Sequence, residues 1–287
     1  MKVLISGGSG FLGEAIAKAV LKAGHSVRIA SRNSPIKVDL TRPETLPAAV
    51  EGMEVVIQCA QFPGHPVENP RLRFTYWNVD AKGSENLAQA AKDAGVQRII
   101  YISGAGTDGK RREPWFQAKW HAEEAIHKTG IPSTILRPSW VYGPGDKSLN
   151  RLIAQIRALP VVPLIGGGGN HIQPIFIQDL AEIVAACVSN TSRENFLFDI
   201  GGPEEMTFKE MMRRVLKVLG KKRLLLPIPK PLMKLAAWPL QFLPNPPLSP
   251  KAVDFITMDV KLDLSAFHHL FPNTRLKTLE EGLKTYL

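Results

Sequence analysis

A glycine-rich turn near the start of the chain places the strongest constraint on its fold. The run SGGSGFLG (6–13) links the strand-like KVLIS to a helical pattern over 11–23, and Gly7, Gly10 and Gly13 are spaced G-x-x-G-x-x-G. Glycine allows a tight turn and a close approach of the backbone to a pyrophosphate, and the N–H groups at the following helix start favour negative charge. At a first strand–helix junction this motif predicts a dinucleotide-binding βαβ unit.

The alternation of strands and helices continues through the first two-thirds of the chain. Strand-like apolar runs follow the turn at 26–31, 54–60, 98–103 and 133–138. Helical patterns lie between them at 80–94 and 115–129. Parallel strands need crossover connections, which helices commonly provide. We therefore expect an α/β fold with a Rossmann-type, doubly wound parallel sheet.

After residue 145 the pattern becomes less regular, which predicts a second unit. Residues 1–145 together with about 174–202 are expected to form an NAD(P)-binding Rossmann domain. About 146–173 together with 203–287 are expected to form a smaller, discontinuous C-terminal lobe that meets a substrate or a partner.

The charge balance narrows the range of partners. The chain has 36 lysine and arginine residues against 26 aspartate and glutamate residues, a net charge of +10. Such a surplus favours anionic partners, although a diffuse excess that only aids solubility is an equal alternative. The basic clusters at 109–112 and 220–223 are short and lack interleaved aromatic residues, so we do not expect nucleic-acid binding.

Cysteine usage and the absence of targeting patterns indicate a reducing compartment. Cys59 and Cys187 give no disulfide framework, and the histidines show no metal-ligand spacing. The sequence contains no signal-peptide pattern and no apolar run of about 18 residues. We expect a cytoplasmic protein without a metal site, with peripheral attachment at the inner face of the membrane as an alternative.

The end of the second strand bears on the choice of cofactor. Sites that prefer NAD commonly place an acidic residue there to bind the ribose hydroxyls, whereas this chain has Ala30, Ser31, Arg32 and Asn33. A guanidinium can instead pair with a 2′-phosphate. We expect NADP(H) in preference to NAD(H), with Arg32 as the phosphate ligand and Ser31 assisting. A solvated surface arginine is the alternative.

These features together resemble the short-chain dehydrogenase/reductase superfamily, in its extended or atypical branch. The resemblance covers most of the chain and rests on GGSGFLG, on NVDAKGSENLAQAAKDAGVQRIIYIS (78–103), on LRPSWVYGPGD (136–146) and on PIFIQDLAEIV (174–184). Residues 144–184 and the ending LEEGLKTYL are similar to one subgroup, the NADPH-binding accessory subunit of respiratory complex I and its bacterial relatives.

Catalysis in this superfamily uses a tyrosine, a lysine and a serine or threonine, and the resemblance places only the lysine clearly in this chain. Lys119 matches the lysine, which puts Trp115 at the position of the tyrosine. An indole N–H can donate a hydrogen bond but does not titrate near neutral pH, so it cannot act as the general acid. The hydroxyl residue falls nearest Gly104, with Ser103 and Thr107 on either side. The catalytic residues are therefore unknown, and Ser103 is a candidate only for the hydroxyl role.

The resemblance also extends the expected cofactor site. Lys119 is best explained by contact of its ammonium with ribose hydroxyls, and a solvated surface lysine is the alternative. Asp39 and Leu40 are expected beside the adenine. The full expected cofactor-binding set is Gly7, Gly10, Phe11, Leu12, Gly13, Ser31, Arg32, Asp39, Leu40, Cys59, Ala60, Gln61, Lys119, Pro138 and Val141.

Two groups outside this set could act as a displaced acid. His65 lies in the loop QFPGHPVENP (61–70), which could overhang the site, and Tyr142 lies in VYGPG. A lone loop histidine is more often a surface residue, and a tyrosine in such a loop is more often a packing residue.

An apolar segment near the C-terminus has two interpretations. Residues 221–250, KKRLLLPIPKPLMKLAAWPLQFLPNPPLSP, combine a basic start with an apolar run broken by prolines. The segment could rest on a membrane, with Trp238 and Phe242 inserted and basic residues near acidic headgroups. It could instead cover the substrate cleft, with Leu232, Leu235 and Ala236 packed inward, which is the commoner use of such helices. Both fit a cleft that accepts a lipid-like or quinone-like molecule.

Three functions remain in view. We expect an NADP(H)-binding protein that lacks the usual catalytic tyrosine and has an accessory, assembly or redox-related role near a membrane respiratory or quinone system. Because Trp115 stands at the position of the catalytic tyrosine, whether the protein is an enzyme is left open. One alternative is an active NAD(P)-dependent reductase, epimerase or dehydratase that uses a displaced acid on an unidentified substrate. The other is a regulator that senses the cofactor and changes its affinity for a protein partner.

Overall fold

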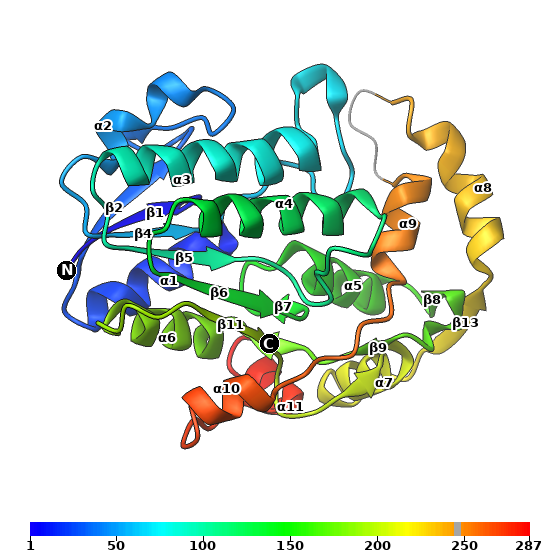
Figure 1. Cartoon of the computed structure of the whole chain (residues 1–287). Coiled ribbons are helices and arrows are strands. Elements are labelled where there is room, and N and C mark those ends of the chain that lie inside the picture. The colour runs from blue at the N-terminus through cyan, green and yellow to red at the C-terminus, as the bar shows by residue number, and fades with distance from the viewer. Residues whose placement is uncertain (244–247) are drawn as a thin grey trace.

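Seven parallel strands form the central sheet, in the order β11-β6-β5-β4-β1-β2-β3 (Figure 1). The computed structural model describes residues 1–243 and 248–287. The strands of this sheet are β1 (Lys2–Ser6), β2 (Ser26–Ser31), β3 (Ile36–Lys37), β4 (Val55–Gln58), β5 (Arg98–Ile102), β6 (Ser133–Pro138) and β11 (Phe196–Ile200). Because β1 lies between β2 and β4, the order reverses there, and the ends of these strands lie where ligands bind in open α/β sheets.

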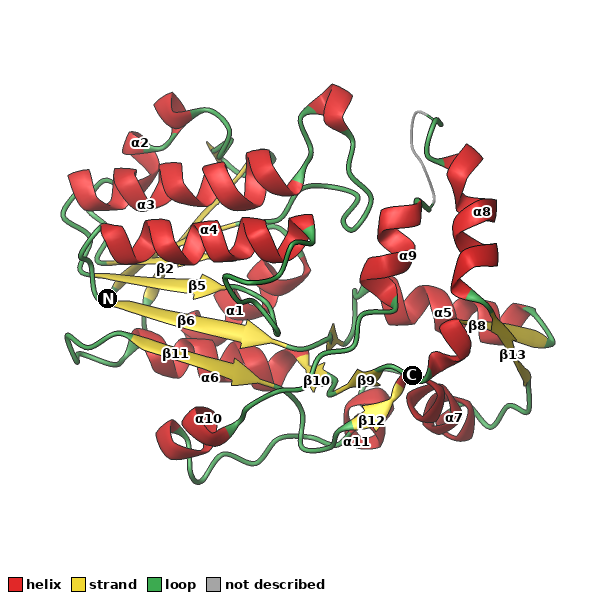
Figure 2. Cartoon of the chain, turned by 45° about the vertical axis from the view of Figure 1, so that its right-hand side comes forward, coloured by secondary structure: helices red, strands yellow, loops and turns green. Residues whose placement is uncertain are grey.

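Helices cover both faces of the sheet (Figures 1 and 2). On one face, α1 (Phe11–Lys22) packs against α6 (Ile177–Val188). On the other face, α3 (Gly83–Asp93) packs against α4 (Pro114–Lys128), and α2 (Pro47–Val50) lies beside α3. The expected α/β, Rossmann-type doubly wound sheet is therefore confirmed.

Burial on both faces explains why the central strands are apolar throughout. Ile5, Ile57 and Ile100 are register partners and belong to the core cluster on the α1 and α6 side. Their neighbours Val56 and Ile99 belong to the cluster on the α3 and α4 side. Successive side chains of a strand point to opposite faces, so a strand covered on both sides loses the usual polar alternation.

Most of the remaining elements after residue 146 extend the molecule beyond one end of the sheet, whereas the helix Ser265–Leu270 packs against β11 (Figure 2). Short helices and a π-helical stretch occupy Pro43–Thr45, Pro70–Leu72, Tyr76–Lys82 and Gly166–Gly168. The other helices are α5 (Lys147–Ala158), α7 (Phe208–Val218), α8 (Lys230–Leu240), α9 (Pro250–Ile256), α10 (Ser265–Leu270) and α11 (Leu279–Lys284). The paired short strands are β7 (Val141–Tyr142) with β10 (Ile175–Phe176), β9 (His171–Ile172) with β12 (Met206–Thr207), and β8 (Val161–Ile165) with β13 (Leu224–Ile228). The expected division into two domains stays a prediction.

The proline-rich run after residue 223 is more regular than its composition suggests. It forms β13 and α8, and α8 contains Pro239 near its end. The expectation that Leu232, Leu235 and Ala236 pack inward is wrong, because all three side chains are exposed. The inward residue is Ala237, which is fully buried, on the side where α8 contacts α9. No helix within 1–243 and 248–287 has the length and apolar character needed to cross a membrane.

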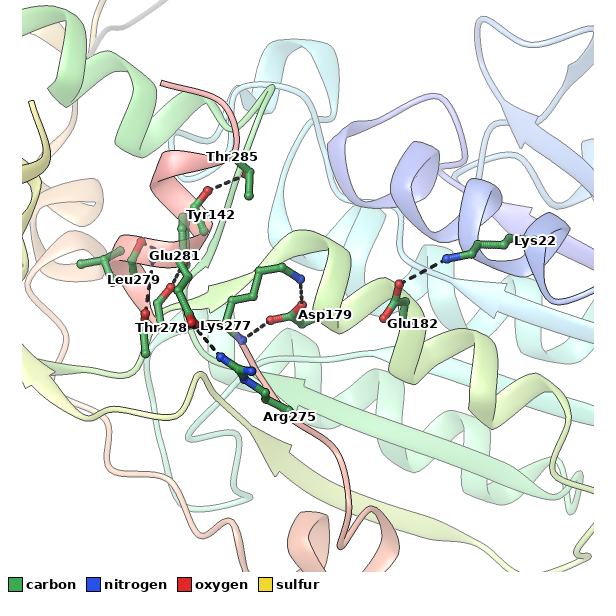
Figure 3. A network of polar contacts seen from close by, with 11 residues as sticks. Lys22, Tyr142, Asp179, Glu182, Arg275, Lys277, Thr278, Leu279, Glu281 and Thr285 are labelled. Carbon is green, nitrogen blue, oxygen red and sulfur yellow. Dashed lines mark hydrogen bonds and ion pairs between the residues drawn. The ribbon is translucent and has the colours of Figure 1, made fainter.

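Polar contacts tie the C-terminal segment to α6 and β7 (Figure 3). Asp179 on α6 accepts hydrogen bonds from the backbone N–H of Lys277 at 2.7 Å and from its ammonium at 2.8 Å. Tyr142 donates its hydroxyl to the carbonyl of Thr278 at 3.1 Å, so this tyrosine is a packing residue with a satisfied hydroxyl. Thr278 and Glu281 then form a capping box that starts α11. The segment is thereby held by a buried carboxylate rather than by apolar contact alone.

Replacing Asp179 by alanine is expected to lower the free energy of unfolding by about 2–3 kcal/mol, because a partly buried N–H donor and a partly exposed ammonium both lose their charged acceptor. Glu182→Ala on the same helix is the matched control. Its contact with Lys22 is 3.8 Å long and exposed to solvent, so its loss should cost less than about 0.5 kcal/mol. Denaturant unfolding followed by circular dichroism measures the free energy of unfolding of both variants. Equal losses for the two variants would contradict the role of Asp179 in holding the C-terminal segment.

Candidate functional site

A cavity of about 530 Å³ lies at the carboxyl ends of β1, β2 and β4. Residues from the glycine turn, the end of β2 and the loops after β3 and β4 line it. From the set expected to bind the cofactor, the lining contains Gly7, Gly10, Phe11, Leu12, Gly13, Ser31, Arg32, Asp39, Leu40, Cys59, Ala60 and Gln61. Sequence positions far apart are therefore brought together where the topology places a ligand.

The glycine turn has the backbone geometry that its sequence predicts. Gly7 has φ +78°, and a Cβ there would lie 2.7 Å from the Cα of Ala60. A Cβ on Gly13 would collide with the carbonyl oxygen of Gly7. The N–H of Gly10 donates to that carbonyl at 2.9 Å, and no side chain caps α1. The first N–H groups of α1 thus remain available for an anion at the cavity.

The cavity rim carries an excess of positive charge. Arg32, Arg42, Arg73 and Lys147 line it. Only Arg32 was expected from the sequence, because Arg42 and Arg73 come from separate loops, Lys147 begins α5, and the three belong to no local motif. The guanidinium of Arg32 lies 4.7 Å from the centre of the Phe74 ring, a contact that orients it without neutralising it.

The two carboxylates in the lining are already engaged within the chain. Asp39 accepts hydrogen bonds from the N–H and the hydroxyl of Thr41. Asp146 caps α5 by accepting from the N–H groups of Ser148 and Leu149 at 2.8 and 2.7 Å. Because the lining has four cations against these two carboxylates, the local field favours a negatively charged ligand.

Lys119 lies behind the cavity rather than in its lining. Its side chain is 1% exposed, and its ammonium is 3.2 Å from a carboxylate oxygen of Asp80 and 3.4 Å from the carbonyl of Ile102. Burial alone would lower the pKa of Lys119, but Tyr101 and Asp80 outweigh it and hold the pKa above its ordinary value. The alternative of a solvated surface lysine is therefore wrong.

Three members of the expected cofactor set are not in the lining. These are Lys119, Pro138 and Val141. Contact of Lys119 with a ribose hydroxyl stays a prediction, and it requires the ammonium to share its charge with Asp80. Sequence reasoning missed Asp80, because a single acid in a helical pattern gives no signal of a buried partner.

Trp115 fills the space beside the expected hydroxyl position. A Cβ on Gly104 would collide with the six-membered ring of the indole. Trp115 also packs edge-on against Phe116 and Phe255, with ring centres 4.9 and 5.3 Å apart. Its Nε1 is buried without a hydrogen-bond partner. The indole is thus a packing group here, and Gly104 is the residue that makes room for it.

Ser103 does not face the cavity. It is buried, and its hydroxyl donates to Glu123, which also binds Arg137. Thr107 donates to the carbonyl of Gly104. Both hydroxyls nearest Gly104 are therefore committed to internal contacts, and Ser103 gains no support as a site residue.

His65 lies in the cavity wall within an aromatic cluster. Its ring centre is 4.8 Å from that of Phe255 and 5.5 Å from that of Tyr76. Burial, with a smaller contribution from the charge of Lys119, lowers the pKa of His65 to about 3. The imidazole therefore stays neutral near pH 7 and cannot donate a proton as an imidazolium there.

This low pKa should make stability depend on pH through His65. The unfolded chain protonates the imidazole below about pH 6.5, whereas the folded chain does so only near pH 3, so stability present above pH 6.5 is lost as the pH falls. Between pH 7.5 and 5.5, wild type should lose about 1.4 kcal/mol more unfolding free energy than His65→Leu. The exposed His127→Gln variant should keep the wild-type dependence in urea unfolding. Identical pH profiles for wild type and His65→Leu would refute the burial argument.

Comparison with known proteins identifies the family to which the glycine turn and the parallel sheet belong. Residues 3–201 match the NAD dependent epimerase/dehydratase family. The chain is 27% identical over 260 residues to the mitochondrial NADH dehydrogenase (ubiquinone) 1 alpha subcomplex subunit 9 of Arabidopsis thaliana, covering 84% of this chain and 63% of that protein. It is 25% identical over 258 residues to the 2-alkyl-3-oxoalkanoate reductase of Stenotrophomonas maltophilia, covering 78% of this chain and 77% of the reductase. The chain thus spans under two-thirds of the Arabidopsis subunit.

A solved structure shares the fold at lower identity. It is the UDP-glucuronic acid 4-epimerase of Bacillus cereus in complex with UDP-glucuronic acid and NAD, with a TM-score of 0.75 and 20% identity over 99% of this chain and 97% of that one. The family match includes the glycine turn, β2, β4 and the rest of the parallel sheet through β11. The protein belongs to the NAD dependent epimerase/dehydratase family, within the extended short-chain dehydrogenases/reductases.

Proposed function

We propose that this protein binds NADP(H) without carrying out the usual tyrosine-dependent chemistry, and that it has an accessory or assembly role at a membrane redox or quinone system. The observation that carries the proposal is the packing of Trp115 against Gly104 behind an intact phosphate turn. The turn supports binding of a dinucleotide, and the indole occupies the space that a hydroxyl side chain at residue 104 would need.

The preference for NADP(H) is supported by the charges at the end of β2. Arg32 is exposed at the cavity, and Ser31 lies beside it with its hydroxyl 2.9 Å from that of Ser9. A guanidinium and a neighbouring hydroxyl suit a 2′-phosphate, whereas no carboxylate is available at this position for a free ribose. Arg42 and Arg73 add to the field that favours the extra phosphate charge.

Replacing Arg32 by glutamate should separate the two cofactors. Affinity for NADPH is expected to fall by at least about tenfold, because a charge-assisted contact is lost and a repulsive one is added. Affinity for NADH should change by less than about threefold, or improve. Isothermal titration calorimetry with both cofactors measures this, and Arg71→Glu, an exposed charge reversal outside the lining, is the matched control. Equal losses for NADPH and NADH would overturn the assignment of Arg32.

The absence of tyrosine chemistry is supported by the groups around Trp115. NADP(H), when bound, would supply a hydride or accept one. The chain must then move a proton at the substrate oxygen, and the indole cannot do so near neutral pH. Burial raises the pKa of Tyr101 to about 12, and it raises that of Tyr76 as well. Lys119 is held by Asp80, and His65 stays neutral.

Turnover measurements test this directly. Wild type should oxidise NADPH at the background rate with a 3-oxoalkanoate ester or a short-chain quinone, while binding NADPH by calorimetry. The double change Trp115→Tyr and Gly104→Ser should keep cofactor affinity within about threefold, because the smaller phenol frees the space needed at residue 104. Trp120→Tyr, on the exposed side of the same helix, is the control. Rapid wild-type loss of absorbance at 340 nm with either substrate would refute the proposal.

The accessory role is supported by relatives, not by the site alone. The Arabidopsis relative is by its name a subunit of an NADH dehydrogenase that uses ubiquinone. We infer a protein-complex partner in a membrane redox system and, for the smaller lobe, a lipid-like or quinone-like ligand. The cellular place that suits both is the inner face of a membrane, reached from the cytoplasm.

A further inference from the structure

Helix α8 presents an apolar face to solvent. Leu232, Leu235 and Trp238 recur at a spacing of three residues and are 57%, 71% and 58% exposed. Phe242, just beyond the helix, is 66% exposed and packs edge-on against Trp238 with ring centres 5.4 Å apart. Residues three and four apart share one side of a helix, so these side chains form one continuous surface. Apolar patches of this kind on a soluble fold mark interaction sites.

Contacts on the opposite side of α8 fix this orientation. Ala237 is fully buried, and the ammonium of Lys234 lies 2.6 Å from the carboxylate of Asp254 on α9. The ammonium of Lys230 donates to the carbonyl of Thr257 at 3.2 Å. The helix therefore cannot turn its leucines inward without breaking an ion pair and unburying Ala237.

The strand that leads into α8 carries further exposed leucines. Leu224 and Leu226 on β13 are 64% and 46% exposed, and alternate residues of a strand point to one side. β13 pairs with β8 and leads directly into α8, and α7, β13 and α8 follow one another along the right-hand side of Figure 1. We call the exposed side chains of Leu224, Leu226, Leu232, Leu235, Trp238 and Phe242 the α8 surface.

The positive charge of the chain is concentrated in the same segment. Residues 211–253 contain nine lysines and arginines and no aspartate or glutamate. The rest of the chain then has 27 basic against 26 acidic residues, so nearly the whole net charge of +10 comes from this segment. The surplus is therefore not diffuse.

Several of these cations are free to act outside the chain. Arg213, Lys217, Lys221 and Lys222 are exposed, and across the described parts of the chain none of them has a carboxylate within ion-pair distance. Arg213 and Lys217 lie on α7, and Lys221 and Lys222 lie in the turn that leads from α7 to Leu224 of the α8 surface. The segment thus combines an apolar surface with an unneutralised basic border.

We infer that the α8 surface docks on an anionic lipid bilayer, with its leucines and aromatic rings at the level of the acyl chains and the basic border at the headgroups. This inference rests on the membrane-associated role proposed above and names the surface that performs it. An amphipathic helix with apolar and aromatic residues on one face and lysines near it has the chemistry of an interfacial membrane helix. A second copy of the chain is a poorer occupant, since pairing the surface with itself would bring two basic borders together.

Vesicle sedimentation of the full chain tests the inference. Wild type should bind vesicles of phosphatidylcholine with phosphatidylglycerol at least about tenfold more tightly than vesicles of phosphatidylcholine alone, and this difference should shrink in high salt. The double change Leu235→Ser and Trp238→Ser should weaken binding by at least about tenfold. Its matched control is Leu21→Ser with Trp77→Ser, which removes a leucine and a tryptophan that are 56% and 51% exposed elsewhere.

A second pair of variants tests the charge separately. Lys221→Glu with Lys222→Glu should weaken binding to the anionic vesicles by at least about tenfold. Lys18→Glu with Lys128→Glu makes the same change in net charge on α1 and α4 and should have less than about a threefold effect. NADPH affinity, measured on every variant, confirms that each one is folded.

The outcomes separate this inference from the proposed function. The inference is overturned, even if NADPH binds, when wild type does not sediment with phosphatidylglycerol vesicles. It is also overturned when the α8-surface and lysine variants bind these vesicles as tightly as their control variants do. A wild-type dimer that dissociates on Leu235→Ser with Trp238→Ser, without vesicle binding, also overturns it. If the protein binds vesicles and also oxidises NADPH rapidly, the inference about the α8 surface is supported and the proposed non-catalytic role is overturned.

Discussion

The close approach of α1 to the end of β1 is the constraint on which the rest of the structure depends. Gly13 has no room for a side chain above the carbonyl of Gly7, and Gly7 itself has a left-handed φ beside Ala60. These contacts set the direction of α1, which packs beside α6 on one face of the sheet, and they open the cavity at the end of the sheet. The position of the glycines thus determines both the packing of one sheet face and the site of anion binding.

The region behind the cavity is a packed core that contains a buried ion pair and a cluster of aromatic rings. Lys119 and Asp80 form an ion pair deep in the core, and such pairs cost a large desolvation energy that their attraction only partly offsets. Trp115, Phe255, His65 and Tyr76 fill the adjoining space with aromatic rings. The ring faces pack within the chain, whereas the Nε1 of Trp115 and the Nε2 of His65 are buried without a hydrogen-bond partner.

Much of the fold could be predicted because its signals are local. The strand expected at 26–31 is β2, the helix expected at 115–129 is α4 (Pro114–Lys128), and the glycine spacing located the cavity. The rim cations Arg42, Arg73 and Lys147 could not be predicted, because two separate loops and the start of α5 bring them together. Which face of α8 is exposed to solvent also could not be predicted from the sequence. Its apolar pattern is visible, but which side faces the protein depends on Ala237 and on the pairing of Lys234 with Asp254 on another helix.

The fit of Trp115 into the space above Gly104 has a consequence for how this chain can vary. A side chain at residue 104 is blocked while the indole is present, and a phenol at residue 115 alone would leave a void where the indole packed. Each single step toward the usual pair of residues therefore passes through a poorly packed intermediate. The two positions are therefore coupled by epistasis, because the side chain tolerated at one depends on the side chain present at the other.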